Sequence, residues 1–263
     1  MNDNFQKNIK KLIELVGAKS KHSDYQLLHP ILAKISPSLS FTYDPKGKSE
    51  TSRQAFMSKH LSLAGLSVLD IGANTGYFSM AAIDEGAKWV VSQEGNIEHA
   101  EFISLSAICL DIKDRIEVRA SYFDFSSETV EPQRFDLALC LNVLHHLGDD
   151  FGDNELTLDA AKKEMLEALN RLSNAADKCW MQLGFNWKGD RNRPLFPNGT
   201  KTEIIDFVQR GTQGHWDIER IAVFDPISRA YEEANSINLA RFDELGEFLN
   251  RPLFLLRSHQ NLS

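Results

Sequence analysis

The sequence predicts an α/β fold: a mostly parallel seven-stranded sheet with helices on both faces and an antiparallel edge strand, preceded by an N-terminal helical extension. From about residue 60, short apolar runs alternate with amphipathic segments of helical length, which is typical of such sheets. The chain has 263 residues, 42% of them hydrophobic, enough for one large domain with additions. No apolar run reaches the length of a membrane span.

The N-terminal extension is expected to comprise residues 1–59. Residues 4–17 carry apolar side chains at helical spacing, and residues 25–35 suit a second helix. Residues 40–52 are polar and rich in turn formers, which predicts a loop. A helix over residues 53–63 then leads into the first strand.

The main domain is expected to comprise residues 60–263. Five apolar runs predict its parallel strands, at 67–71, 88–92, 115–120, 136–141 and 179–185. The helices between them are predicted to reach from the first strand to about 85, and to span 97–110 and 155–174. The tail predicts two helices and two closing strands, in the order 200–213, 218–224, 237–248 and 252–256. The two closing strands complete a seven-stranded sheet, one of them as its antiparallel edge.

Charge and cysteine usage narrow the class of protein. The formal net charge is −8, and its overall field repels a polyanion, so nucleic acid is a disfavoured partner. Cys109, Cys140 and Cys179 are widely spaced within apolar stretches and form no Cys-x-x-Cys pair, so we interpret them as buried small hydrophobic residues. The first twenty residues lack the apolar core of a signal peptide, which predicts a cytoplasmic protein.

A glycine-bearing turn follows the first strand of the main domain. Gly72 and Gly76 allow a tight turn and the close approach of a ligand, and the next helix N-terminus offers N–H groups to a carboxylate. A dinucleotide site needs three glycines in G-x-G-x-x-G, but Asn74 and Tyr77 occupy the later positions. The run from Asp70, read as D-x-G-x-x-x-G, resembles motif I of class I S-adenosylmethionine (SAM)-dependent methyltransferases. The resemblance covers roughly residues 60–186.

The resemblance implies SAM as cofactor and S-adenosylhomocysteine as product. In that family an acid at the end of the second strand accepts hydrogen bonds from the ribose hydroxyls, and here it is Glu94. Ser121 stands where the family often has an aspartate for adenine, so Tyr122 or Phe123 is expected to pack on the base, with Asp124 as a fallback. The residues expected to bind the cofactor are Asp70, Gly72, Ala73, Asn74, Gly76, Tyr77, Phe78, Glu94, Ser121, Tyr122, Leu141 and Asn142.

Asn142, His145 and His146 follow the fourth strand, at the sheet edge where the methyl group is expected. Methyl transfer is an in-line displacement that depends on positioning, and a hydroxyl acceptor must also lose its proton. A histidine titrates in the useful range, so either one is a candidate general base. In the alternative, a histidine packs on SAM or caps the next helix. No third ligand stands at regular spacing, so no metal is expected.

The acceptor pocket is expected to draw on two further segments. Gln182, Asn186 and Trp187 follow the fifth strand and suit the pocket wall. The cations in the same stretch suit a phosphate or carboxylate, or else a solvated loop: Lys188, Arg191 and Arg193. Tyr43 and Arg53 suggest that the extension folds over the site as a lid, and residues 200–250 are expected to add elements on the substrate side.

Three functions fit the residues. The stretches YFSMAA and LNVLHHL resemble bacterial enzymes that methylate surface polysaccharides or their precursors, which implies O-methylation of a small polar, sugar or phosphorylated acceptor. The cofactor block also resembles the methyltransferases that modify the wobble uridine of tRNA. A third possibility is a SAM- or nucleotide-binding protein without methyl transfer. The Asn142-Val143-Leu144 run lacks the Pro-Pro-aromatic signature of DNA amino-methyltransferases.

Overall fold

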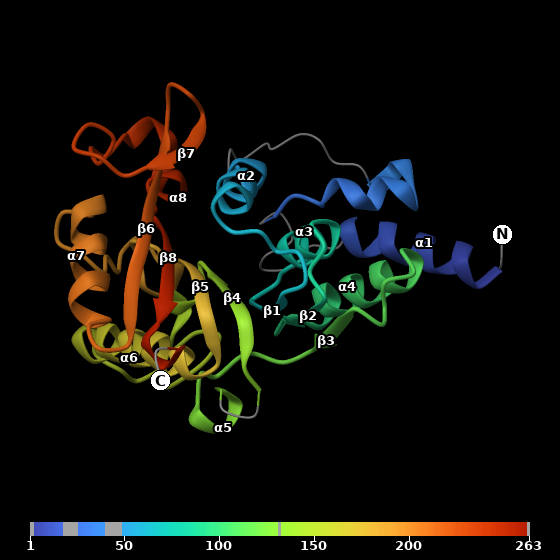
Figure 1. Ribbon diagram of the computed structural model, residues 1–263, viewed down its shortest axis with the longest axis horizontal. Coiled ribbons are helices and arrows are strands. Elements are labelled where there is room, and N and C mark those ends of the chain that lie inside the picture. The colour runs from blue at the N-terminus through green and yellow to red at the C-terminus, as the bar shows by residue number, and fades with distance from the viewer. Residues whose placement is uncertain (1–2, 18–25, 40–48, 131–132, 262–263) are drawn as a thin grey trace.

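The computed structural model describes residues 3–17, 26–39, 49–130 and 133–261. One mixed sheet runs through the molecule (Figure 1). Its strands are β1 (Ser67–Ile71), β2 (Trp89–Gln93), β3 (Ile116–Arg119), β4 (Phe135–Leu141), β5 (Ala176–Gln182), β6 (Trp216–Asp225), β7 (Ala230–Glu233) and β8 (Leu253–Ser258). Its helices are α1 (Asp3–Gly17), α2 (Glu50–His60), α3 (Tyr77–Asp84), α4 (Ile97–Cys109), α5 (Ser127–Val130), α6 (Leu158–Arg171), α7 (Lys201–Gly211) and α8 (Gly246–Leu249).

The strand order is β3-β2-β1-β4-β5-β8-β6-β7. The first five strands of the chain pair in parallel, while β8 runs antiparallel between β5 and β6. From β1 the chain continues outward to β2 and β3 and then crosses back to β4 on the other side. Open α/β sheets bind ligands at such a switch, beyond the carboxyl ends of the strands. A ligand site is therefore expected at the carboxyl ends of β1 and β4.

The predicted fold class is confirmed except for the number of strands. The sheet has eight strands and not seven, because β7 pairs antiparallel with β6 and adds a hairpin. Of the four residues of β7 only Tyr231 is buried, so the segment lacks the apolar pattern by which the other strands are recognised. The hairpin extends the sheet beyond the strands expected from the sequence.

Helices cover both faces of the sheet, as predicted. Within the sheet, neighbouring residues of a strand contribute to opposite faces, since side chains alternate. Leu69 packs into a core that includes residues of α6 and α7, whereas Val68 packs into a core with residues of α2, α3 and α4. Figure 1 shows α2, in cyan, between α3 and the segment that carries β7, and both are its neighbours.

Two predicted helices are wrong. In place of a helix over 25–35, the described residues form two short 3₁₀ turns, Pro30–Lys34 and Pro37–Leu39, because each proline removes an N–H donor and restricts the residue before it. In place of a helix over 237–248, the chain forms a 3₁₀ turn at Asp243–Leu245 and then α8. The Asn235 side chain accepts from the backbone N–H groups of residues 237 and 238, which favours a turn over a helix.

The predicted loop over 40–52 ends earlier than expected, since α2 begins at Glu50. Residues 40–48 of that loop, with Tyr43, lie outside the described residues. In the part of the chain that is described, no helix has both the length and the apolar composition that crossing a bilayer requires.

Candidate active site

A cavity lies at the carboxyl ends of β1, β2 and β4, with further walls from α2, α3 and α8. Most of the residues predicted to bind the cofactor line it: Asp70, Gly72, Asn74, Phe78, Glu94, Tyr122, Leu141 and Asn142. Others support the loop or rim without bordering the cavity: Ala73, Gly76, Tyr77 and Ser121. The residues that the sequence singled out are thus gathered at the switch in strand order.

The loop after β1 requires its two predicted glycines. Gly72 has φ +67° and Gly76 has φ +79°, in the left-handed region that side chains disfavour. A Cβ on Gly72 would lie 2.9 Å from Cγ2 of Val143, and a Cβ on Gly76 would lie 2.9 Å from Cγ1 of Ile103. The backbone therefore passes close to the end of β4 and to α4, which only glycine permits.

Glu94 presents a fixed, buried carboxylate at the end of β2. Its Oε2 accepts a hydrogen bond from the Asn74 backbone N–H at 2.7 Å, and its Oε1 accepts from the Asn96 N–H at 2.7 Å. Each carboxylate oxygen has a second lone pair that can accept from a ligand hydroxyl. Burial raises the pKa of Glu94 above its ordinary value, and the two backbone hydrogen bonds oppose that rise. The site suits a vicinal diol such as a ribose.

Asp70 lies deeper, at the end of β1. The Ser79 hydroxyl donates to its Oδ2 at 2.6 Å, and the hydroxyls of Ser79 and Ser92 are 2.7 Å apart. Burial raises the pKa of Asp70 to about 7, and the nearby Glu94 carboxylate adds to the rise. Asp70 therefore connects β1, α3 and β2 through hydrogen bonds at the base of the cavity.

Tyr122 forms the outer rim beyond β3. Its side chain is 53% exposed, yet its ring lies over Gly95, where a Cβ would come within 2.3 Å of Cδ1. Ser121 beside it accepts from the Gln93 side-chain amide at its carbonyl and at its hydroxyl, at 2.7 and 2.8 Å. Gln93 lines the cavity although the sequence did not single it out. Because Gln93 directly precedes Glu94 at the end of β2, its position in the sequence could have identified it.

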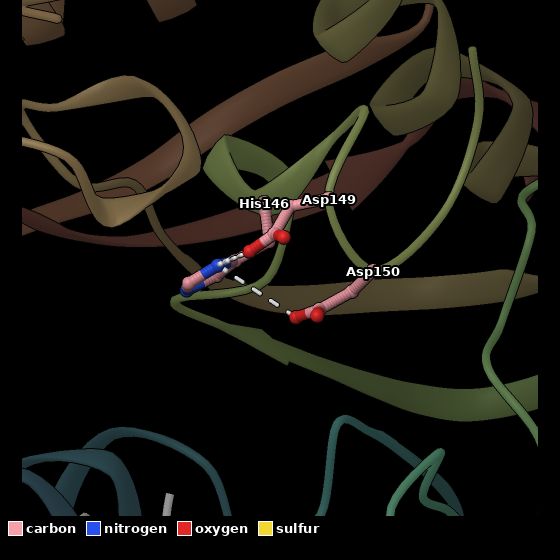
Figure 2. Close-up of side chains that lie close together, drawn as sticks. All are labelled: His146, Asp149 and Asp150. Carbon is pink, nitrogen blue, oxygen red and sulfur yellow. Dashed lines mark ion pairs between the residues drawn. The ribbon is translucent and has the colours of Figure 1, made fainter. Parts of the chain in front are cut away.

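The two adjacent histidines have different surroundings. His145 is fully buried and does not border the cavity; its Nδ1 accepts from the Gly184 N–H at 3.2 Å, and burial holds its pKa well below the ordinary value. His146 lines the cavity. Its Nδ1 lies 3.6 Å from a carboxylate oxygen of Asp150 and 3.9 Å from one of Asp149. Figure 2 shows both aspartates beside the imidazole. Only His146 is placed to meet a ligand.

His146, Asp149 and Asp150 also form a possible donor set for a cation. One ligand atom from each lies within 4.8 Å of the others. Imidazole nitrogen and carboxylate oxygens are donors that divalent transition metals accept. His145 is not part of this set. Asp149 and Asp150 lie close to His146 because a tight turn, in which their N–H groups donate to the His146 carbonyl, brings the three residues together.

Asn142 on the cavity wall and the buried Gln182 behind it belong to one polar network. Asn142 has φ +66°, and its side-chain amide donates to Oε1 of Gln182 at 3.0 Å. Arg251 donates to Oδ1 of Asn142 at 2.8 Å and pairs with Glu247 through two hydrogen bonds. Gln182 is fully buried, so it positions its neighbours and does not border the cavity.

The rest of the predicted acceptor stretch lies away from the cavity. Trp187 is buried and its Nε1 donates to the Leu147 carbonyl at 2.7 Å. Lys188 donates to the Asn154 carbonyl at 3.2 Å. Asn186 is bridged to Pro194 on the following strand-like segment. The structure brings none of the remaining residues of the stretch to the cavity wall: Asn186, Trp187, Lys188, Arg191 and Arg193.

Residues from the N-terminal extension and from the segment before β8 complete the cavity wall. Arg53 of α2, predicted from the sequence, lines the cavity beside Glu50. Gln26 and Phe248 line it too, and no sequence signal pointed to either. The Gln26 side-chain oxygen accepts from the Tyr77 N–H at 3.1 Å, so the extension contacts the start of α3.

No family model and no curated protein matches this sequence. Among solved structures, WbdD has a TM-score of 0.57 and 18% identity over 94% of this chain and 46% of its own. A second WbdD structure, described as a bifunctional kinase-methyltransferase, gives 0.55 and 18% over the same shares. A candidate RNA methyltransferase from Pyrococcus horikoshii gives 0.49 and 14%, over 95% of this chain and 98% of its own. The chain spans less than half the length of WbdD.

At 18% identity the likeness to WbdD concerns the fold alone. In this chain the fold places a glycine turn after β1, a buried acid after β2 and a cavity at the strand switch, in the order that the resemblance implies. The chain therefore has the fold of the class I SAM-dependent methyltransferases.

Proposed function

We propose that this protein is a cytoplasmic SAM-dependent methyltransferase that methylates an oxygen of a small polar, sugar or phosphorylated acceptor, in surface-glycan or related biosynthesis. The observation that carries the proposal is the cavity at the ends of β1 and β4, where Gly72 permits close approach and Glu94 presents a fixed carboxylate. The resemblance of the sequence to polysaccharide methyltransferases supports the acceptor class, while the likeness of the fold to WbdD, described as a bifunctional kinase-methyltransferase, supports methyl transfer.

The residues at the cavity fit the cofactor. Glu94 would accept from the two ribose hydroxyls, and Tyr122 at the rim would pack against the adenine. Gly72 and Val143 line the cavity where the methionyl part would lie. When bound, SAM supplies an electrophilic methyl group on a sulfonium, and acidic side chains around the cavity favour a cationic ligand: Glu50, Asp70, Glu94 and Asp150.

His146 is the proposed general base. Asp149 and Asp150 lie beside its Nδ1, which leaves Nε2 to accept the proton of an acceptor hydroxyl (Figure 2). The two carboxylates stabilise the imidazolium that forms, in the way that an acid orients the histidine of other catalytic dyads. Asn142 at the end of β4 would help to position the reacting groups.

Titration calorimetry with SAM tests the cofactor assignment. Glu94→Ala should weaken SAM binding about 10- to 100-fold, because hydrogen bonds to a charged acceptor are lost. Glu98→Ala removes the same charge from the exposed first turn of α4 and should leave affinity unchanged. Wild-type protein that does not bind SAM, or a Glu94→Ala variant that binds it undiminished, would overturn the assignment.

The base assignment predicts that His146→Ala lowers turnover about 10²- to 10⁴-fold with SAM affinity retained. The measurement is S-adenosylhomocysteine release with a panel of hydroxyl-bearing acceptors, before and after chelation of metals. Turnover that persists in His146→Ala contradicts a base at this position. Turnover that chelation abolishes would instead assign the His146, Asp149 and Asp150 group to a cation.

The other functions predict different results in the same assays. A tRNA-modifying enzyme would shift bulk tRNA in a gel at moderate salt, which the net charge of −8 disfavours. A non-catalytic protein would bind SAM and release no S-adenosylhomocysteine with any acceptor. Either outcome would replace the O-methylation proposal.

A further inference from the structure

Backbone N–H groups after β1 are the first place where a ligand carboxylate would be expected to bind. In this protein they are nearly all engaged within the chain. The N–H groups of Gly72 and Ala73 donate to the Gln93 carbonyl, at 2.8 and 3.2 Å, and that of Gly76 donates to the Ala73 carbonyl at 2.9 Å. The Asn74 N–H donates to Glu94 at 2.7 Å. The glycine turn is therefore held by its own hydrogen bonds.

The first turn of α3 is equally engaged. The Thr75 N–H donates to the side-chain oxygen of Asn74 at 2.8 Å, and the Tyr77 N–H donates to Gln26 at 3.1 Å. The backbone of Ser79 donates to the Asp70 carboxylate. Of the first turn, only the Phe78 N–H has no acceptor among the described residues. The α3 N-terminus thus offers little to an anionic ligand, and the expectation that it holds a carboxylate loses its main support.

Arg53 is the alternative on the cavity wall. It is 3% exposed, and its guanidinium lies 5.2 Å from the ring centre of Phe78. Its Nη1 donates to Gln182 at 3.1 Å, and its Nη2 lies 3.3 Å from Glu50. Its buried Nε has no hydrogen-bond partner among the described residues. A buried guanidinium with donors in excess of acceptors suits a further anionic oxygen.

The described residues that line the cavity include one permanent cation that could attract an anion. Among the described residues that line it, Arg53 is the one permanent cation, whereas Glu50, Asp70, Glu94 and Asp150 are acids. Asp150 is close enough to Glu94 to raise the pKa of that carboxyl. Arg53 is therefore the described cation of this wall that can attract a carboxylate or phosphate, through the donors that its contacts with Glu50 and Gln182 leave over.

From these contacts we propose that Arg53 binds the anionic group of the ligand in this cavity, in place of the α3 N-terminus. The proposal rests on the proposed function for the identity of the ligand. The anionic group is a carboxylate or phosphate oxygen, and it has two possible sources: the methionyl carboxylate of the cofactor, or an acidic group on the acceptor. The Nε–H of Arg53 and the remaining N–H groups of its guanidinium can donate to either one.

Calorimetry with a matched pair of ligands tests the proposal. S-Adenosylhomocysteine carries the carboxylate, and 5′-methylthioadenosine has the same nucleoside and sulfur without it. Arg53→Gln should weaken S-adenosylhomocysteine about 10- to 100-fold and leave 5′-methylthioadenosine unchanged, which also shows that the cavity is intact. Arg53→Lys should recover part of the loss. Arg220→Gln removes an exposed cation of β6 and serves as the charge control.

A second arm tests the acceptor as the source. Inorganic phosphate is titrated into the complex of each protein with S-adenosylhomocysteine. Phosphate binding by the wild type that Arg53→Gln abolishes, with S-adenosylhomocysteine affinity unchanged, assigns Arg53 to the acceptor. If neither ligand distinguishes Arg53→Gln from the wild type, the proposal is overturned. Wild-type protein that binds neither S-adenosylhomocysteine nor 5′-methylthioadenosine overturns the proposed function instead, so the two failures are distinct.

Discussion

Asp70 is a buried acid whose pKa differs between the folded and the unfolded chain. The hydroxyl of Ser79 donates to it and Ser92 extends the chain of hydrogen bonds, but burial dominates and raises its pKa from 3.8 to about 7. In the unfolded chain the carboxyl ionises near its ordinary value. Between those two values the folded protein binds a proton that the unfolded chain does not, so folding becomes less favourable as the pH rises.

This difference predicts a pH dependence that Asp70→Asn should remove. From pH 4 to pH 7 the wild type should lose stability relative to the variant, by about 1.4 kcal/mol or more, the free energy of one pKa unit. Asparagine retains an acceptor oxygen for Ser79. The free energies of unfolding in urea, measured for both proteins at pH 4, 5.5 and 7, give the result, and parallel curves would contradict it.

The sequence could identify residues that stand at fixed offsets from a strand end. Gly72 and Glu94 follow β1 and β2 directly, and the structure brings both to the cavity. The residues that it could not identify depend on contacts across the chain. Gln26, in the extension, accepts a hydrogen bond from Tyr77, and Phe248 lies in the segment before β8. Neither stands at a fixed offset from β1, β2 or β4, so local spacing cannot identify them. His145 and His146 are neighbours in sequence, yet only the structure separates the buried one from the one that borders the cavity.

At the scale of elements, the strongly apolar strands were predictable and the weakly apolar ones were not. The strands from β1 to β5 are recognised by short apolar runs, although β5 begins at Ala176 and not at Cys179. The hairpin strand β7 has a single buried side chain, so its sequence lacks the alternation of apolar and polar residues that predicts a strand. The 3₁₀ turns at Pro30 and Pro37 show the opposite effect, where apolar spacing suggested a helix and proline chemistry prevented it.

Across the whole molecule, Gln182 joins segments that are far apart in sequence. Its Oε1 accepts from Arg53 at 3.1 Å and from Asn142 at 3.0 Å. Its Nε2 donates to the Tyr231 hydroxyl at 3.1 Å and to the Arg251 carbonyl at 2.9 Å. All four hydrogen bonds of a fully buried amide are thus made. Such a network fixes the extension and the C-terminal segment against β5 and shapes the cavity that they share.

Gln182→Leu should therefore destabilise the protein strongly. The substitution removes four hydrogen bonds and leaves several of the buried partners unsatisfied, at about 1–3 kcal/mol for each such group, so a loss of at least about 3 kcal/mol is expected. Gln213→Leu in the exposed turn after α7 is the control and should change stability by less than about 0.5 kcal/mol. Urea unfolding of the two variants decides, and a similar effect of both would contradict the role of the network.

The position of β8 has a consequence for how the chain reaches this structure. β8 is the last strand in sequence, yet it lies between β5 and β6 and pairs with both. Until it inserts, β5 is a bare edge and the β6–β7 hairpin has no place in the sheet. A chain still emerging from the ribosome therefore exposes two unpaired edges, which are templates for aggregation. Phe248 lies in α8, directly before β8, so we expect the part of the cavity wall that it contributes to take its place together with β8.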